Sequence, residues 1–231
     1  MTVVEETEDK VVIFFDIDNT LYSKGAGVHD LMQEYIHRYF VTHLDLDDES
    51  AEQLHQHYYR DFGLALEGLV RFHQVDALEY NKEVDDALPL PDILKRDQRL
   101  RDLLQSFDSS KVEKLWLFTN AYKTHGKRVV RLLGIDDLFA GITYCDYSQR
   151  PLLCKPMKPV FDRALKEAGV TDPSKCVFVD DSALNIKAAK NLGWGTTVLF
   201  AEEGIPENPV GDFQIQSLHE LPNILPHLFK A

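Results

Sequence analysis

The chain has 231 residues, 44% hydrophobic and 27% charged, which fits a globular protein with one sizeable core and room for a smaller second domain. Its net charge of −13 disfavours nucleic acids and anionic membranes as partners, because both are negative. The three cysteines, Cys145, Cys154 and Cys176, lack zinc-ligand spacing, and no long apolar run occurs. We expect free thiols, no signal peptide or membrane span, and a cytoplasmic protein, with the nucleus as a second location.

The first predicted element is a strand at residues 11–15, where five apolar residues stand in a row. Such a run is typical of a strand that is buried on both faces in the middle of a parallel sheet. Asp16 and Asp18 follow the strand, and Thr20 comes soon after. Because side chains alternate along an extended backbone, we expect the two carboxylates to project to the same side. Open α/β sheets bind ligands at the carboxyl ends of their strands.

Residues 24–88 carry helical patterns and no strand signal. Apolar residues recur at helical spacing over 28–40, which predicts an amphipathic helix. Asp47 suits the N-cap of a second helix that ends near Gly63, and more helical pattern follows. We therefore predict a compact insertion of four short helices, closed by a stiff proline-containing linker at 88–91.

Strand and helix patterns then alternate, which places the rest of the chain in the same sheet as the first strand. Strands are expected at 114–118, 141–144, 176–179 and 196–200, and helices at 97–107, 125–133, 160–168, 183–192 and 218–229. The predicted fold class is α/β, a doubly wound (Rossmann-like) parallel sheet with a small all-helical domain inserted after its first strand. Residues 1–23 and 89–231 would form the core domain, and residues 24–88 the inserted one.

Polar residues follow several of these strands, and one lysine precedes a helix. In chain order they are Asp16 and Asp18, Thr119 and Asn120, Lys155, and Asp180 and Asp181. Taken singly, each has a plainer explanation, because acidic pairs often form turns or helix caps and a lysine before proline is usually a solvated surface residue. Parallel strands, however, would bring all of these groups to one edge of the sheet. Their joint occurrence therefore favours a shared site.

The set is chemically coherent. An ionised aspartate is a nucleophile that needs no separate base, and its acyl phosphate divides one hydrolysis into two steps. A second carboxyl group could protonate the leaving oxygen and later accept a proton from the attacking water. Several carboxylates would repel a phosphate unless a cation such as Mg²⁺ intervened. Lys155 would add a fixed positive charge, and Thr119 a hydrogen bond.

These motifs resemble those of the haloacid dehalogenase-like (HAD) superfamily. Residues 16–20 (DIDNT) are similar to its first motif, 119–120 (TN) to its second, 155–156 (KP) to its third, and 179–182 (VDDS) with Asn185 to its fourth. The resemblance implies a core that closes under a helical C1 cap, whose position residues 24–88 match. Many relatives carry an aspartate where Asn185 stands, so its part in the metal shell stays open.

The resemblance also implies a role for each motif residue. Asp16 would be the nucleophile and Asp18 the general acid and base, while Thr119 and Lys155 would bind phosphate. Mg²⁺ would be held by Asp16, Asp181 and the backbone carbonyl of Asp18, with Asp180 supporting or sharing the metal. Asn19 and Tyr22, which stand beside the catalytic strand end, and Asn120 are expected to contact the substrate.

The residues in and around the motifs indicate a narrower group within the superfamily. Residues 14–22 (FFDIDNTLY), 58–59 (YY) with 63–64 (GL), 115–120 (LWLFTN) and 141–145 (GITYC) resemble the fungal pyrimidine 5′-nucleotidase group. That group hydrolyses nucleoside monophosphates such as UMP and CMP, and one member type is also described as a lysophosphatidic acid phosphatase. The resemblance implies a small phosphorylated substrate, and we expect a monomer or a weak homodimer. The aromatic residues of the cap are expected to form mostly its own core.

The leading hypothesis is thus a Mg²⁺-dependent phosphomonoesterase for nucleoside 5′-monophosphates. One alternative is a phosphatase with the same core that acts on lysophosphatidic acid or a sugar phosphate. Transfer of the phosphoryl group within a sugar, as in phosphoglucomutases, stays open. A third class is an inactive HAD-fold protein that only binds partners, although every expected catalytic group is in place.

Overall fold

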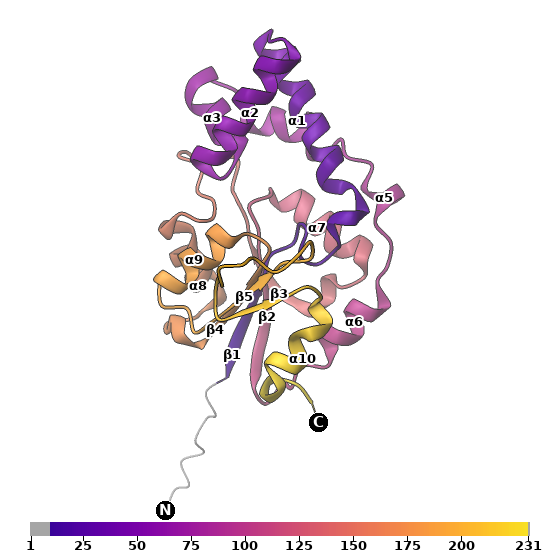
Figure 1. Cartoon of the computed structure of the whole chain (residues 1–231), viewed down its shortest axis with the longest axis vertical. Coiled ribbons are helices and arrows are strands. Elements are labelled where there is room, and N and C mark those ends of the chain that lie inside the picture. Colours follow the sequence, from indigo (N-terminus) through magenta and orange to yellow (C-terminus); the bar gives the residue numbers. More distant parts are fainter. Residues whose placement is uncertain (1–9, 231) are drawn as a thin grey trace, which may run out of the picture.

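The computed structural model describes residues 10–230. Its centre is one parallel sheet whose strands run, in chain order, as β1 (Val11–Phe15), β2 (Val112–Phe118), β3 (Phe139–Thr143), β4 (Cys176–Asp180), β5 (Thr196–Phe200) and β6 (Phe213–Ile215). The spatial order is β3-β2-β1-β4-β5-β6, so β1 lies in the middle, between β2 and β4 (Figure 1). The predicted α/β fold with a parallel sheet is therefore confirmed. Only β6 has no counterpart in the prediction, because three residues are too short to show a pattern.

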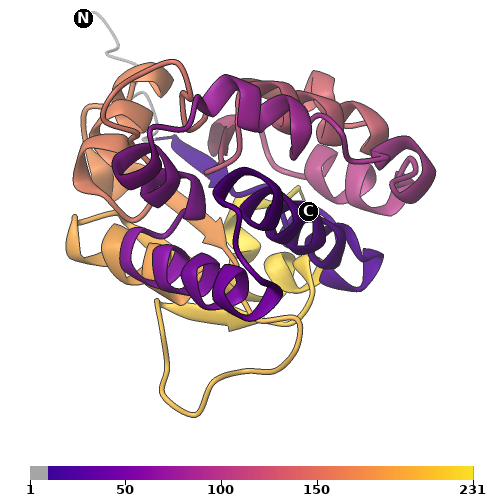
Figure 2. The same cartoon turned by 90° about the horizontal axis from the view of Figure 1, so that it is seen from above.

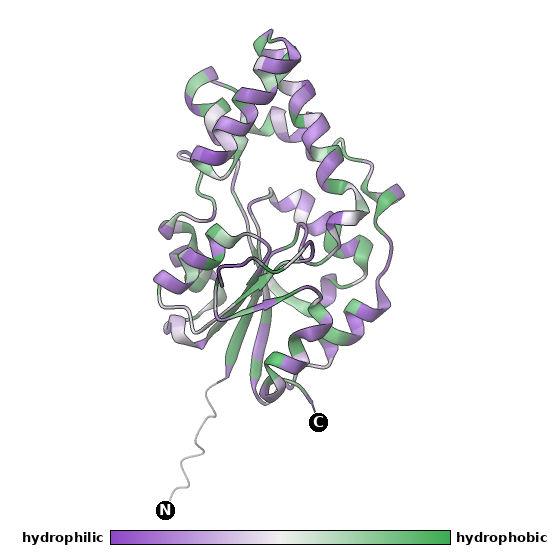
Figure 3. Ribbon diagram, viewed as in Figure 1, coloured by the Kyte–Doolittle hydropathy of each residue, from purple (hydrophilic) through white to green (hydrophobic). Residues whose placement is uncertain are grey.

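Helices cover both faces of the sheet. They are α5 (Leu90–Ile93), α6 (Gln98–Gln105), α7 (Lys123–Leu133), α8 (Lys158–Ala168), α9 (Ala183–Asn191) and α10 (Leu221–Ile224), with 3-10 turns η1 (Lys24–Ala26), η2 (Asp136–Leu138), η3 (Pro173–Lys175), η4 (Leu218–Glu220) and η5 (Pro226–Leu228). Colouring by hydropathy shows the apolar strands enclosed by helices of mixed polarity (Figure 3). Within residues 10–230, no helix combines the length and apolar character that a membrane span requires.

Two predicted segments differ in detail. The prediction of a continuous helix at 218–229 is wrong, because the structure has the single-turn α10 with one 3-10 turn before it and one after it. Pro226 follows α10 and cannot continue it, since proline has no backbone N–H and its ring clashes with the preceding turn. In the linker expected at 88–91, the chain already enters α5, whose first turn tolerates Pro91.

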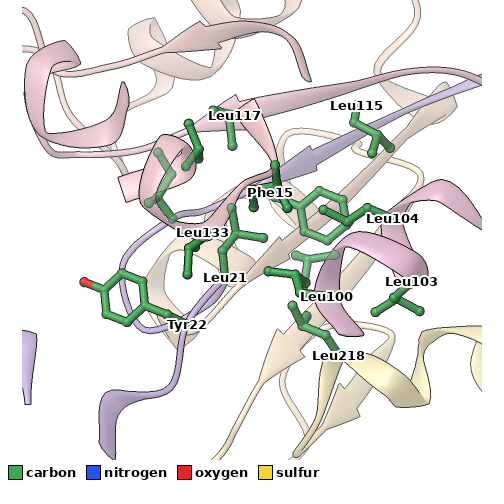
Figure 4. Packing of buried hydrophobic residues seen from close by; sticks show 14 of the residues in the cluster. Phe15, Leu21, Tyr22, Leu100, Leu103, Leu104, Leu115, Leu117, Leu133 and Leu218 are labelled. Carbon is green, nitrogen blue, oxygen red and sulfur yellow. The ribbon is translucent and has the colours of Figure 1, made fainter. Parts of the chain in front are cut away.

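The alternation of side chains along β1 divides the core between the two faces of the sheet. Phe15 points to the face covered by α6 and α7, where it packs in one cluster with Leu100 and Leu104 (Figure 4). Phe14 points to the opposite face and packs against Trp194, with ring centroids 4.7 Å apart. Both phenylalanines are fully buried. The strand that carries Asp16 is therefore fixed from both sides.

Four further helices form the segment that the sequence assigns to a cap: α1 (Val28–Leu44), α2 (Asp48–Phe62), α3 (Ala65–His73) and α4 (Ala77–Glu83). They stand beyond the carboxyl ends of the strands (Figure 1) and lie across them when seen from above (Figure 2). Asp47 caps α2 as predicted, because its side chain accepts a hydrogen bond from the Ser50 amide at 2.8 Å. Phe40, Tyr58 and Leu66 form the centre of a separate hydrophobic cluster. The division into two domains at 24–88 stays a prediction.

Candidate active site

The neighbouring strands β2, β1 and β4 bring the predicted site residues to one edge of the sheet. Asp16 follows β1, and its amide still donates to the Val179 carbonyl of β4 at 2.9 Å. Asp180 is the last residue of β4, and Thr119 follows β2. These groups come together because the strands are parallel and adjacent, as the sequence predicts.

Lys155 lies at the centre of the site with only 1% of its surface exposed. Its ammonium donates to Asp16 Oδ1 at 2.7 Å, to Asp180 Oδ2 at 2.6 Å and to the Phe118 carbonyl at 2.6 Å. Burial alone would lower the pKa of Lys155, but the two carboxylates more than offset this and raise it. The lysine therefore stays protonated and ties the ends of three strands together.

Asn120 holds the backbone of Lys155 in place. Its side-chain amide donates to the Lys155 carbonyl at 2.9 Å, and the Lys155 amide donates to Asn120 Oδ1 at 2.6 Å. Neighbouring Thr119 is buried, and its hydroxyl accepts a hydrogen bond from the Ala121 amide at 3.0 Å. The structure thus gives Asn120 a supporting contact, and the predicted contacts of both residues with substrate stay predictions.

Three carboxylates form a cluster that suits a divalent cation. Asp16, Asp180 and Asp181 each have an oxygen within 4.8 Å of the other two. Burial raises the pKa of Asp16, and although Lys155 opposes this, the neighbouring carboxylates raise it further. Partial desolvation, together with Asp180, likewise raises the pKa of Asp181. Negative charge therefore exceeds what one ammonium neutralises, and a hard cation with oxygen ligands such as Mg²⁺ fits the donor set.

Asp180 and Asp181 differ in how their oxygens are used. Asp180 is fully buried, and its carboxylate accepts hydrogen bonds from Lys155, from the Ser182 amide at 2.8 Å and from the Asn185 side chain at 3.0 and 3.1 Å. Asp181 is exposed at the wall of a cavity. The geometry favours Asp181 as a metal ligand and Asp180 as its support. Asn185, whose part the sequence left open, donates to Asp180.

Asp18 lies beside this cluster but has different partners. Its Oδ1 accepts the Tyr22 hydroxyl at 2.7 Å and lies 2.7 Å from His125 Nε2. Burial would raise the pKa of Asp18, but His125 and the hydrogen bonds lower it below its ordinary value. The Thr20 hydroxyl donates to Asp16 Oδ2 at 3.3 Å. Tyr22 is buried against Asp18, and its predicted contact with substrate stays untested.

His125 was not predicted as a site residue, because a histidine early in a predicted helix belongs to no recognisable motif. The signal that could have found it is its place in the helix that follows Thr119 and Asn120, since that helix must begin at the same edge of the sheet. Which residue of the helix faces Asp18 depends on how α7 packs beside β1, and this packing is a tertiary feature.

A cavity of about 730 Å³ extends from Asp181 to the cap. Asn19 and Asp181 line it at the core, and Tyr59 lines it from α2. The other lining residues are Lys24, His29, Gln33, His55, Gln56, Arg60, Ala183, Leu199, Phe200, Ala201, Glu202, Glu203, Gly204 and Pro206. The expectation that the cap aromatics mostly form its core holds for Tyr58, which is 5% exposed, but not for Tyr59 and Phe72, which are 57% and 62% exposed.

Comparison with known proteins agrees with this geometry. The sequence model of the haloacid dehalogenase-like hydrolases matches residues 11–193. Phosphate metabolism protein 8 of Saccharomyces cerevisiae is 44% identical over 200 residues, or 83% of this chain and 62% of that protein. Pyrimidine 5′-nucleotidase YjjG of Escherichia coli is 31% identical over 114 residues, or 48% of this chain and 49% of that protein. The matches thus span about half to three fifths of these relatives' lengths.

Solved structures show the same fold. The HAD-hydrolase YfnB from Bacillus subtilis, bound to magnesium, superposes with a TM-score of 0.64 at 17% identity, covering 94% of this chain and 98% of that one. A HAD phosphatase from Thermococcus onnurineus superposes with a TM-score of 0.61 at 21% identity, covering 94% and 97%. The family match covers all four motif regions, from the strand before Asp16 to the helix after Asp181. The chain belongs to the haloacid dehalogenase-like hydrolase family.

Proposed function

We propose that this hydrolase is a Mg²⁺-dependent phosphomonoesterase that acts on nucleoside 5′-monophosphates, with UMP and CMP as preferred substrates, through an aspartyl-phosphate intermediate. The observation that carries the proposal is the arrangement of Asp16 against Lys155, with Asp180 and Asp181 beside them and Asp18 two residues further on. It provides a nucleophile, a fixed cation, a metal site and a proton carrier around one point.

The two half-reactions assign a task to each carboxyl group. A carboxylate oxygen of Asp16 attacks phosphorus, the bond from phosphorus to the leaving oxygen breaks, and Asp18 donates its proton to that oxygen. Water then attacks phosphorus and gives its proton to Asp18, and Asp16 is released. The pKa of Asp18 lies below its ordinary value in the free protein. A bound phosphate dianion would raise that pKa, which favours the protonated form needed in the first step.

Asp16 and Asp181 would hold the Mg²⁺, which supplies neutralisation of the phosphate charge when bound. We expect EDTA to stop phosphate release and Mg²⁺ to restore it. In Asp181→Asn, the Mg²⁺ concentration needed for half-maximal activity should rise about 10-fold or more. The rise in thermal unfolding midpoint that Mg²⁺ causes should shrink in parallel.

A matched control for that metal test is Asp162→Asn, which changes an exposed aspartate on α8 that pairs with Lys158. It should respond to Mg²⁺ as the wild type does. Activity that survives EDTA, or an equal Mg²⁺ effect on the unfolding of the Asp181→Asn variant and the wild type, would contradict the assigned metal site.

The substrate part of the proposal is supported by the cavity and by the relatives. A volume of about 730 Å³ suits a small-molecule substrate of nucleotide size. Tyr59 lines the cavity with a largely exposed ring, which can stack on a base. The similarity to a pyrimidine 5′-nucleotidase, which is 31% identical over 48% of this chain, supports the same substrate class.

A substrate panel tests this part. We expect kcat/KM for UMP and CMP to exceed the values for purine nucleotides, ribose 5-phosphate, glycerol 3-phosphate and lysophosphatidic acid. Tyr59→Ala should lower kcat/KM for UMP about 10-fold by loss of stacking and leave ribose 5-phosphate almost unchanged. Phe72→Ala is the control, because Phe72 is similarly exposed on α3 but lies outside the cavity.

Other outcomes of the panel would favour the alternatives. A higher kcat/KM for lysophosphatidic acid or for a sugar phosphate would assign the same core to that substrate. Products phosphorylated at a new position would indicate a mutase. No turnover of any phosphomonoester, 4-nitrophenyl phosphate included, would favour an inactive protein that only binds partners. Dehalogenation is disfavoured because that chemistry has no leaving oxygen to protonate, yet Asp18 is present.

A further inference from the structure

A buried histidine outside the predicted motifs contacts the carboxyl group of Asp18. His125 lies in the first turn of α7, and none of its surface is exposed. Its Nε2 lies 2.7 Å from Asp18 Oδ1, and the Tyr22 hydroxyl donates to the same oxygen at 2.7 Å. Since a carboxylate oxygen only accepts, we assign the imidazole proton to Nε2.

The two oxygens of Asp18 therefore have different surroundings. Oδ1 accepts two hydrogen bonds, which occupy its lone pairs. Within residues 10–230, Oδ2 has no hydrogen-bond partner, and the side chain as a whole is 30% exposed. Two donors on one oxygen also fix the plane of the carboxyl group. A proton that passes to a leaving group is thus carried by Oδ2.

The helix that carries His125 is also linked to the segment that leaves the cap. Asp85 lies in the segment after α4 and is 3% exposed. Its charge acts on His125, and its carboxyl group is hydrogen-bonded to the Tyr147 hydroxyl. In the described part of the chain, Asp85 Oδ2 and His125 Nδ1 are both buried without a hydrogen-bond partner. Arg128, one turn further along α7, donates to the carbonyls of Asp85 at 3.3 Å and Leu88 at 2.9 Å. Helix α7 thus joins the segment that leaves the cap to the carboxyl group of Asp18.

Packing alone does not account for a histidine at this position. A buried polar nitrogen without a hydrogen-bond partner is unfavourable, and an apolar side chain of similar size would avoid this cost. The contact that offsets this cost in the structure is the one to Asp18. The charges that act most strongly on His125 are the carboxylates of Asp18 and Asp85.

We propose that His125 is a positioning residue, which together with Tyr22 fixes Oδ1 of Asp18 so that Oδ2 faces the leaving oxygen. The inference rests on the proposed phosphatase function, because it concerns the proton transfer to the leaving oxygen. It does not depend on the substrate being a nucleotide.

The dependence on the leaving group tests this role. The value of kcat/KM includes the departure of the leaving group but not the later hydrolysis of the aspartyl phosphate. The ribose oxygen of UMP needs a proton in order to leave, whereas 4-nitrophenolate leaves without one. His125→Phe, which keeps the bulk and removes the donor, should therefore lower kcat/KM for UMP about 100-fold and for 4-nitrophenyl phosphate less than about 5-fold. His125→Gln, which keeps a donor, should recover part of the UMP rate.

Two further variants complete the experiment. Lys127→Ala, an exposed change on the same helix, should behave as the wild type with both substrates. If His125→Phe does not fold, Tyr22→Phe removes the other donor by the loss of a single oxygen atom, and it should show the same selective loss at smaller size. An equal fall with both substrates in these variants would overturn the positioning role.

The test of His125 can be distinguished from the test of the proposed nucleotidase function. If the wild type hydrolyses 4-nitrophenyl phosphate but not UMP, the nucleotide assignment fails, and glycerol 3-phosphate or ribose 5-phosphate takes the place of UMP in the comparison. A leaving-group-dependent loss with either alkyl phosphate would support the role of His125. A loss that is the same for alkyl and aryl phosphates would again overturn it.

Discussion

Asp16→Asn should release phosphate at least about 10⁴-fold more slowly than the wild type, because a neutral amide cannot take the place of the attacking carboxylate. The fold should persist. Asparagine is nearly isosteric with aspartate, and the Lys155 ammonium keeps its contacts with Asp180 and the Phe118 carbonyl. The measurement is phosphate release under single-turnover conditions, with Asp162→Asn as the control for loss of one negative charge.

Stability gives the same variant a second result. The pKa of Asp16 is raised in the folded protein, mainly by burial, so its ionisation weakens the fold as pH rises through that value. At neutral pH and without metal, Asp16→Asn removes this cost, and its unfolding midpoint should equal or exceed that of the wild type. A variant that retains wild-type turnover would contradict the role of nucleophile, and one that unfolds would contradict the electrostatic account.

Lys155→Met should have the second large effect, because it removes the ammonium that contacts both Asp16 and Asp180. Loss of one partner from a buried ion pair costs about 3–5 kcal/mol, and loss of an electrostatic contact to the reacting group about 10²–10³-fold in kcat. We expect both losses when Lys155→Met is compared with Lys158→Met, whose lysine is exposed on α8. Chemical denaturation in EDTA measures the first loss, and phosphate release in saturating Mg²⁺ the second.

A double variant separates the two effects of this lysine. Lys155→Met with Asp180→Asn removes one of the carboxylates that lysine neutralises, so it should recover part of the lost stability without recovering activity. If the double variant is no more stable than Lys155→Met, the carboxylates are not the source of the instability. If Lys155→Met turns over substrate at the wild-type rate, its charge has no part in the reaction.

The sequence was sufficient to predict β1 to β5 of the sheet but not the three-residue β6, and for a physical reason. Buried parallel strands are continuous apolar runs, so they can be recognised in the sequence. The polar residues that directly follow such a run, as at Asp16 and Asp180, can then be placed at the carboxyl end of the strand. Lys155 was predicted from its place before a helix and from the joint occurrence of the polar groups, because it stands in a loop, where Asn120 holds its backbone. The spacing of Asn120 and Lys155 along the chain does not predict the hydrogen bonds between them.

Contacts between helices and strand ends could not be predicted in this way. His125 meets Asp18 only because α7 packs beside β1, and Tyr59 differs from Tyr58 only because α2 turns one ring inward and the next toward the cavity. Adjacent residues on a helix diverge by about 100°, so a small error in helix orientation exchanges a core ring for a cavity ring. The prediction of a continuous helix at 218–229 was wrong for a local reason, because two prolines interrupt an otherwise helical apolar pattern.

Trapping the covalent intermediate shows whether Asp16 is the nucleophile. The chain is mixed with UMP and Mg²⁺, quenched in acid during turnover, reduced with borohydride and digested, and the peptide that contains residues 11–22 is sequenced by mass spectrometry. Borohydride converts an aspartyl phosphate into homoserine, so the account predicts homoserine at position 16 and an unchanged Asp18. Phosphate release without modification at position 16, or with modification at another carboxyl group, would contradict it.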